Sequence, residues 1–255
     1  MKNGFFIYIL ILMPFLSCSA RIEGALRHEG SAKLSMEASL APGTASLIRT
    51  LSRAWDSGGD PDAVIIDGPA ISRSMGAAPG ITGVSLKNNG PAAVAGEIHI
   101  DPVDAFLSLP EGRGGPAGGT VGGKADPRRF IVYEPRRASP PSPGRLTITL
   151  DRDSAPMVLS LMSEEVKAYL AALMAPAATG EVLSKADYLD QVGWTYGRAV
   201  ADEIAAARVT AKLGFPGPVS GVRGGTFSGA QALFDIPLVD LLVLESPLEY
   251  EVRWN

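Results

Sequence analysis

The stretch AKLSMEASL, residues 32–40, places an apolar residue at every second position. Strict alternation of this kind is typical of a β-strand that has one face buried and the other in water. Residues 146–150, LTITL, repeat the pattern, and further strands are expected at residues 130–133 and 248–254. These stretches predict sheets with one covered face.

Helical periodicity accompanies the strands. Residues 44–55 and 155–174 carry apolar residues three to four positions apart, as expected for helices with one face against a core. A longer helix is predicted over residues 185–206, where Ser184, with Asp187 three residues on, is a typical N-terminal cap. The combination predicts an α+β fold of mainly antiparallel sheets with helices packed on one face.

Two distant stretches are similar. VAGEIHIDPVDAFLSL at 94–109 and AQALFDIPLVDLLVLE at 230–245 each run from an alternating strand through a Val-Asp pair into an apolar tail. We interpret them as corresponding parts of two related α+β halves, residues 31–134 and 145–255. A proline-rich linker, residues 135–144, separates these halves. The alternative interpretation is chance agreement between two α+β segments.

Residues 1–17 have the layout of a secretory signal peptide. Lys2 provides an early positive charge, and the apolar run of residues 5–13 precedes a cluster of small residues. The run is shorter than the roughly 20 residues that a membrane-spanning helix needs. The segment is therefore predicted to direct export and to be removed.

Leu16-Ser17-Cys18 resembles the lipobox of bacterial lipoproteins, with Phe15 where that pattern usually has leucine. The resemblance implies cleavage before Cys18 and attachment of acyl chains such as palmitate to this cysteine. Several acyl chains hold a protein firmly on a membrane. The chain is thus expected to be anchored through Cys18.

Residues 18–30 would form the lipidated cysteine and a short tether. If the host is Gram-negative, Ser19 after the cysteine favours the outer membrane, by the same resemblance. Ordinary signal peptidase cleavage after Ala20 is the alternative, and it would release a soluble exported protein. An uncleaved anchor is a further alternative.

Composition limits the partners. Cys18 is the single cysteine of 255 residues, which excludes an internal disulfide. The formal net charge of −4 becomes −5 when Lys2 leaves with the signal peptide, and such a chain offers no basic surface for nucleic acid. We expect the membrane as a partner through the lipid, together with an envelope protein or a small-molecule ligand.

Few residues suggest chemistry. GGTVGGKADP at 118–127 resembles a phosphate loop, but Ala125 replaces the hydroxyl residue and Pro127 blocks the following helix. The two histidines, His28 and His99, have no spacing that indicates a catalytic triad or a metal site. We expect no cofactor and no metal.

Asp104 and Asp240 are the weak catalytic candidates. They occupy corresponding positions in the two predicted halves, so a pseudo-twofold arrangement would let the two carboxylates share a proton or a cation. Alternatively, each carboxylate interacts with the amides at the start of a short helix.

The N-terminal features predict a lipid-anchored envelope lipoprotein with a binding or structural role. The alternative is a secreted hydrolase that uses the carboxylates of Asp104 and Asp240. Nothing in the sequence of the folded body names a ligand or a reaction.

Overall fold

The computed structural model describes residues 19–55, 64–76, 78–107, 131–138, 141–160 and 164–255. The predicted signal peptide and Cys18 lie outside the described residues. Within the described part, no helix is long and apolar enough to cross a membrane.

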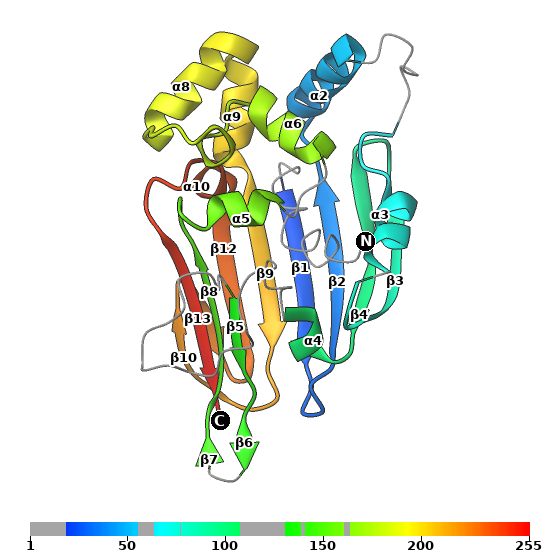
Figure 1. Ribbon diagram of the computed structural model, residues 1–255, viewed down its shortest axis with the longest axis vertical. Helices are drawn as coiled ribbons and strands as arrows, with labels where there is room; N and C mark the ends of the chain where they lie inside the picture. Colours follow the sequence, from blue (N-terminus) through cyan, green and yellow to red (C-terminus); the bar gives the residue numbers. More distant parts are fainter. Residues whose placement is uncertain (1–18, 56–63, 77, 108–130, 139–140, 161–163) are drawn as a thin grey trace, which may run out of the picture.

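The described strands form two sheets that pack face to face (Figure 1). The larger has seven described strands in the order β11-β12-β9-β1-β2-β4-β3, and of its described pairs only β1 and β9 run parallel. Its strands are β1 (Ser19–Leu26), β2 (Ala32–Ser39), β3 (Ile81–Asn88), β4 (Ala93–Ile100), β9 (Arg208–Gly214), β11 (Thr226–Ser228) and β12 (Gln231–Pro237).

The smaller sheet is antiparallel and has four described strands in the order β10-β13-β8-β5. These strands are β5 (Ile131–Glu134), β8 (Gly144–Leu150), β10 (Val219–Arg223) and β13 (Leu248–Trp254). A short hairpin of β6 (Arg137–Ala138) and β7 (Pro141–Ser142) extends from it. The predicted α+β class with mainly antiparallel strands is confirmed.

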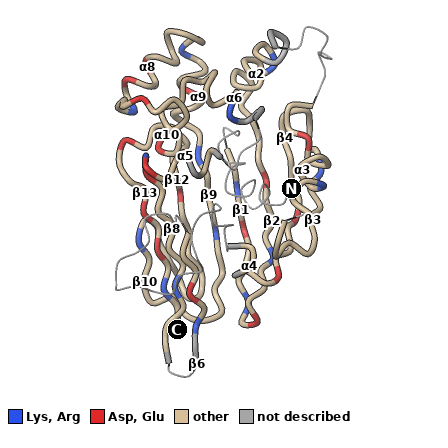
Figure 2. Tube along the Cα trace, in the orientation of Figure 1, with Lys and Arg blue, Asp and Glu red and all other residues tan. Residues whose placement is uncertain are grey.

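Alternation in the sequence becomes alternation of burial. In β2, the inward side chains of Ala32, Leu34, Met36 and Ala38 are buried, and the residues between them face water. Residues of both charge signs are interspersed along the strands (Figure 2). The apolar core therefore lies between the sheets.

Most helices gather at the end of the sheets where β1 starts (Figure 1). Exceptions are α3 (Gly68–Met75), which packs on β3, and α4 (Val103–Leu107), which lies at the opposite end. The gathered helices are α2 (Pro42–Trp55), α5 (Ala155–Ser160), α6 (Glu164–Ala172), α7 (Pro176–Thr179), α8 (Lys185–Tyr196), α9 (Arg198–Ala206) and α10 (Leu238–Val243).

The predicted helix over 185–206 is two helices. Gly197 ends α8 with a φ of 95°, a backbone conformation that glycine adopts without steric cost, and α9 starts immediately afterwards. The predicted cap is present, because the Ser184 hydroxyl accepts a hydrogen bond from the Asp187 amide at 3.1 Å.

The predicted tether over 18–30 is wrong for residues 19–26. Ser19–Leu26 is strand β1, which lies inside the larger sheet between β2 and β9. Its backbone is paired on both sides, and Ala20 is buried. Both of these features hold the segment in the body of the protein.

The two predicted halves share both sheets instead of forming separate bodies. Strand β5 of the first half pairs with β8 of the second, and β1 pairs on one side with β2 of the first half and on the other with β9 of the second. Part of the predicted linker over 135–144 forms the β6–β7 hairpin. The duplication itself stays a prediction.

Candidate functional site

A cavity of about 230 Å³ lies between the two sheets. Three successive inward positions on each of β8, β9 and β13 line it, with α5 and α10 at one end and α4 at the other. Three such positions span about 13 Å along a strand. The residues from these strands are Leu146, Ile148, Leu150, Val209, Ala211, Leu213, Leu248, Tyr250 and Val252.

The cavity lining is almost entirely hydrocarbon. Among the described lining side chains, Tyr250 alone carries a polar atom. Burial, followed by the nearby charge of Asp240, raises the pKa of the Tyr250 hydroxyl above its ordinary value of 10.0, so this group is neutral at physiological pH. Water needs two to four polar partners to stay in a cavity. The site therefore suits an apolar occupant.

The size of this space is unusual for a protein core. Protein interiors contain few voids larger than a water molecule, and an engineered apolar cavity of about 150 Å³ already binds benzene. A space of this volume and lining is therefore large enough for a small apolar ligand.

A second hollow, of about 510 Å³, lies at the end of the sheets where β1 turns into β2. Arg27, His28 and Glu29 of this turn line it, together with residues from the ends of β5 and β13. Two of those residues are Tyr133 and Trp254, whose rings stack with centroids 6.2 Å apart. Unlike the cavity between the sheets, this hollow is rimmed by charge.

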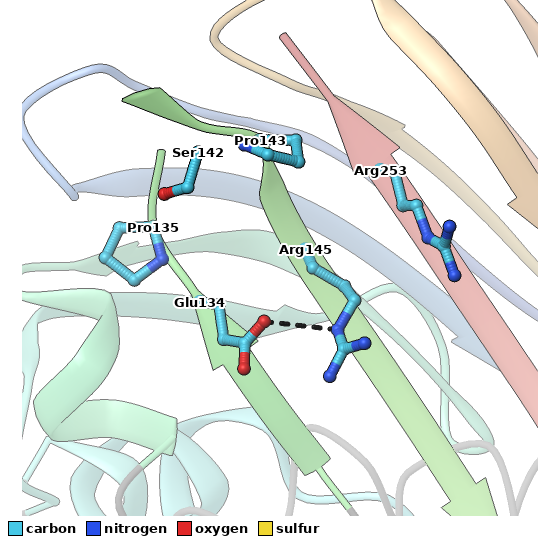
Figure 3. A pocket seen from close by; sticks show the side chains of 6 residues that line it. All are labelled: Glu134, Pro135, Ser142, Pro143, Arg145 and Arg253. Carbon is cyan, nitrogen blue, oxygen red and sulfur yellow. Dashed lines mark ion pairs between the residues drawn. The ribbon is translucent and has the colours of Figure 1, made fainter. Parts of the chain in front are cut away.

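A third hollow, of about 440 Å³, lies on the outer face of the smaller sheet (Figure 3). Arg145 and Arg253 face it, and both are already paired. Arg145 Nε lies 3.2 Å from Glu134 Oε2, and Arg253 Nε lies 2.5 Å from Glu251 Oε1.

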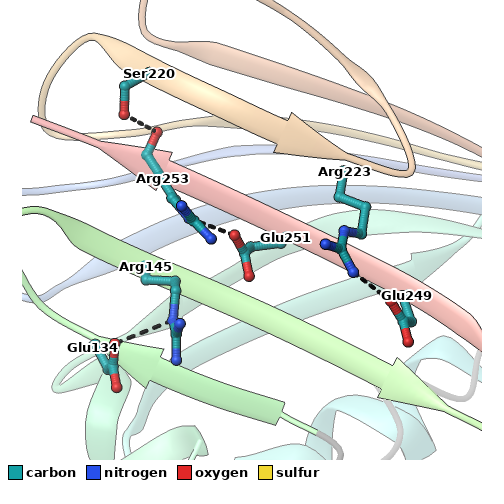
Figure 4. A network of polar contacts seen from close by, with 7 residues as sticks. All are labelled: Glu134, Arg145, Ser220, Arg223, Glu249, Glu251 and Arg253. Atoms are coloured by element: carbon teal, nitrogen blue, oxygen red, sulfur yellow. Dashed lines mark hydrogen bonds and ion pairs between the residues drawn. The ribbon is translucent and has the colours of Figure 1, made fainter.

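The same outer face continues the charge pairing away from the hollow (Figure 4). Arg223 Nη1 lies 2.6 Å from Glu249 Oε2, and the Ser220 hydroxyl donates a hydrogen bond to the Arg253 carbonyl oxygen at 3.3 Å. Exposed pairs of this kind contribute about 0–1 kcal/mol each. We interpret the face as a solvated, internally neutralised surface.

The structure does not bring Asp104 and Asp240 together. Helix α4, which contains Asp104, follows the end of β4 and lies beside the β1–β2 turn, where the Val103 amide donates to the Gly30 carbonyl. Helix α10, which contains Asp240, follows β12 at the other end of the sheet (Figure 1). The side chain of Asp104 lies outside the described part.

Asp240 has a partner of its own. Its Oδ1 atom lies 2.9 Å from Lys185 Nζ, and this contact raises the pKa of the lysine. The described residues hold no group of three or more His, Cys, Asp and Glu side chains arranged for a metal ion.

The predicted anchor point is next to the first described residue. Ser19 begins β1 at the end of the sheet that carries α2 and α10, and its hydroxyl oxygen lies 3.1 Å from that of Ser39. A lipid on Cys18 would therefore attach at the helical end of the molecule.

Comparison with known proteins identifies no family for this chain. No family model matches the sequence, and no curated protein matches it. Among solved structures, the folded domain of LppM from Mycobacterium tuberculosis, determined by NMR, is similar over 93% of this chain and 88% of that domain, with a TM-score of 0.38 and 10% identity. A likeness this distant assigns neither a family nor a function.

Sequence reasoning missed the cavity. The alternating patterns that predicted the strands also identify many of its lining residues, including Leu34, Ile148 and Tyr250. The same patterns are expected of a filled core, so they carried no sign of an open space.

Proposed function

We propose that the protein is an exported, lipid-anchored envelope protein that binds an apolar chain between its two sheets. The cavity of about 230 Å³ with its hydrocarbon lining carries this proposal. A lining that extends about 13 Å along the strands can hold a single acyl chain. Burial of such a chain is favourable by about 0.8 kcal/mol per CH₂ group.

Strand β1 supports cleavage before Cys18. Cleavage after Ala20 would remove Ser19 and Ala20 from the strand, although Ala20 is buried and pairs with Ala38 and Val209. Cleavage before Cys18 leaves the strand complete and presents the cysteine at its start. The paired backbone thus favours the lipoprotein route over release as a soluble protein.

The cavity proposal predicts that Ala211→Phe abolishes binding of an apolar probe. Ala211 lines the cavity, and a phenyl ring there would occupy the space. For the processed protein in amphipol, we expect at least ten-fold weaker binding of methyl cis-parinarate, a neutral ester with a fluorescent chain. The variant should melt at the same temperature or higher, because filling a void offsets its cost.

Lys212→Phe is the matched control. It lies one residue along β9, is exposed, and faces the other side of the sheet, so probe binding should match that of the wild type. Equal binding by both variants, or no binding by the wild-type protein, would rule out the cavity as the site.

The anchor proposal predicts a processed chain of 238 residues, since 255 minus 17 is 238, with acyl chains on Cys18. Intact mass measured on protein from solubilised membranes checks this. Cys18→Ala should move the protein out of the membrane fraction, whereas Ser17→Ala, a small-for-small exchange, should not. An unmodified chain starting at Arg21 would contradict the anchor.

A further inference from the structure

The hollow at the β1–β2 turn lies in line with the cavity. Ile131 of β5 and Val252 of β13 line the cavity, whereas Tyr133 and Trp254 line the hollow. Tyr133 follows Ile131 by two positions on β5, and Trp254 follows Val252 by two positions on β13. Residues two positions apart in a strand face the same side of the sheet and lie about 7 Å apart. The aromatic pair therefore stands between the two spaces, and the hollow is one inward position beyond the cavity.

Positive charge at this hollow is poorly neutralised. Arg136 lines it, is exposed, and has no ion pair with any residue that the structure describes. Arg27 Nη1 lies 3.8 Å from Glu29 Oε1, and its side chain is 62% exposed. That carboxylate also accepts a hydrogen bond from the Ser31 hydroxyl at 3.1 Å. Two guanidinium groups thus face one carboxylate that is engaged within its own turn.

The arginines on the outer face of the smaller sheet, in contrast, are paired with glutamates. Arg145, Arg223 and Arg253 each lie within 3.2 Å of a glutamate oxygen. Arg136 differs from these three arginines in having no ion pair with a described residue. An arginine without a protein partner is well suited to bind a carboxylate or a phosphate through charge-assisted hydrogen bonds.

We propose that the hollow holds the anionic headgroup of the ligand, and that the ligand is a singly acylated amphiphile with a carboxylate or phosphate head. The inference rests on the proposed function, because the acyl chain must occupy the cavity. The chain would pass beside the stacked rings of Tyr133 and Trp254, and the head would meet Arg27 and Arg136. The hollow lies at the end of β1 opposite Ser19, so the head would bind about 23 Å from the anchor point.

Paired binding measurements test the headgroup site. The processed protein in amphipol is titrated with cis-parinaric acid and with its methyl ester, which share one fluorescent chain and differ in charge. We expect the wild-type protein to prefer the acid, and Arg27→Ala with Arg136→Ala to weaken binding of the acid about ten-fold without changing binding of the ester. Arg223→Ala removes the same charge from the outer face of the smaller sheet and should change neither.

The outcomes separate the two proposals. If both probes bind equally and the arginine variants change neither, the headgroup site is wrong and the cavity proposal stands. If neither probe binds the wild-type protein, or if Ala211→Phe leaves binding intact, the cavity proposal fails and the headgroup site fails with it. Loss of acid binding in Arg223→Ala as well would show a general charge effect and would also overturn the headgroup site.

Discussion

Gly96→Ala is expected to prevent stable folding. Gly96 lies in β4, between Met36 of β2 and Leu86 of β3. A Cβ atom at this position would lie 1.9 Å from the Ser85 carbonyl oxygen and 2.8 Å from the Leu86 Cα atom. Both obstacles are backbone atoms held in a strand ladder, so no side-chain rotation relieves the clash. We expect a loss of about 3 kcal/mol or more in the free energy of unfolding.

Gly83→Ala is the matched control, on the neighbouring strand β3. There the nearest atom to a new Cβ is His99 Cβ at 3.8 Å, an ordinary contact. We expect a change within about 1 kcal/mol. Far-ultraviolet circular dichroism of both variants during thermal unfolding checks the comparison. Equal stability of the two proteins would show that β3 and β4 do not approach as closely as described.

The sequence predicted strands better than it predicted their partners. The alternation in residues 32–40 indicates one buried face, and β2 has that face. It contains no information about the neighbour, because pairing depends on residues brought together by the rest of the chain. β1 illustrates the limit: it pairs in parallel with β9, about 190 residues away. Its inward positions include Gly24, which weakens the apolar alternation that would have marked a strand.

The candidate site was harder to predict, for a physical reason. Whether an inward side chain packs or lines a cavity depends on the gap between the sheets and on the size of the residues opposite. Ala32 and Ala211 line the cavity with little volume, yet alanine is common in filled cores as well. The headgroup residues come from the β1–β2 turn and the end of β5. The sequence predicts a tether for the first of these segments and a linker for the second, and neither pattern indicates that Arg27 and Arg136 line the same hollow.

Glu203→Ala is expected to lower stability more than an ordinary surface substitution. The carboxylate of Glu203, on α9, accepts hydrogen bonds from the Gly43 amide at 2.9 Å and the Thr44 amide at 2.7 Å, at the start of α2. It also accepts one from the Thr44 hydroxyl at 2.9 Å. The first amides of a helix have no partner within the helix and carry partial positive charge. A part-buried carboxylate satisfies two of them and joins segments that are about 160 residues apart.

Removing this carboxylate leaves the amides of α2 without their acceptor. Hydrogen bonds to charged groups contribute about 1.5–3 kcal/mol, so we expect Glu203→Ala to cost about 2–3 kcal/mol, or about 5–10 °C in melting temperature. Glu203→Gln should cost less, because an amide oxygen can still accept from one of the donors. Scanning calorimetry measures both.

Asp202→Asn provides the control for the carboxylate bridge. Asp202 is the preceding residue of α9, and its exposed side chain lies 3.5 Å from the Arg198 guanidinium. The substitution also removes a negative charge from the helix, but it leaves the contact with α2 untouched. We expect a change within about 0.5 kcal/mol. If Asp202→Asn and Glu203→Gln destabilised the protein equally, net charge would explain both results and the bridge to α2 would not. A larger loss in the Glu203 variants ties α2, the first described helix, to α9 through one side chain.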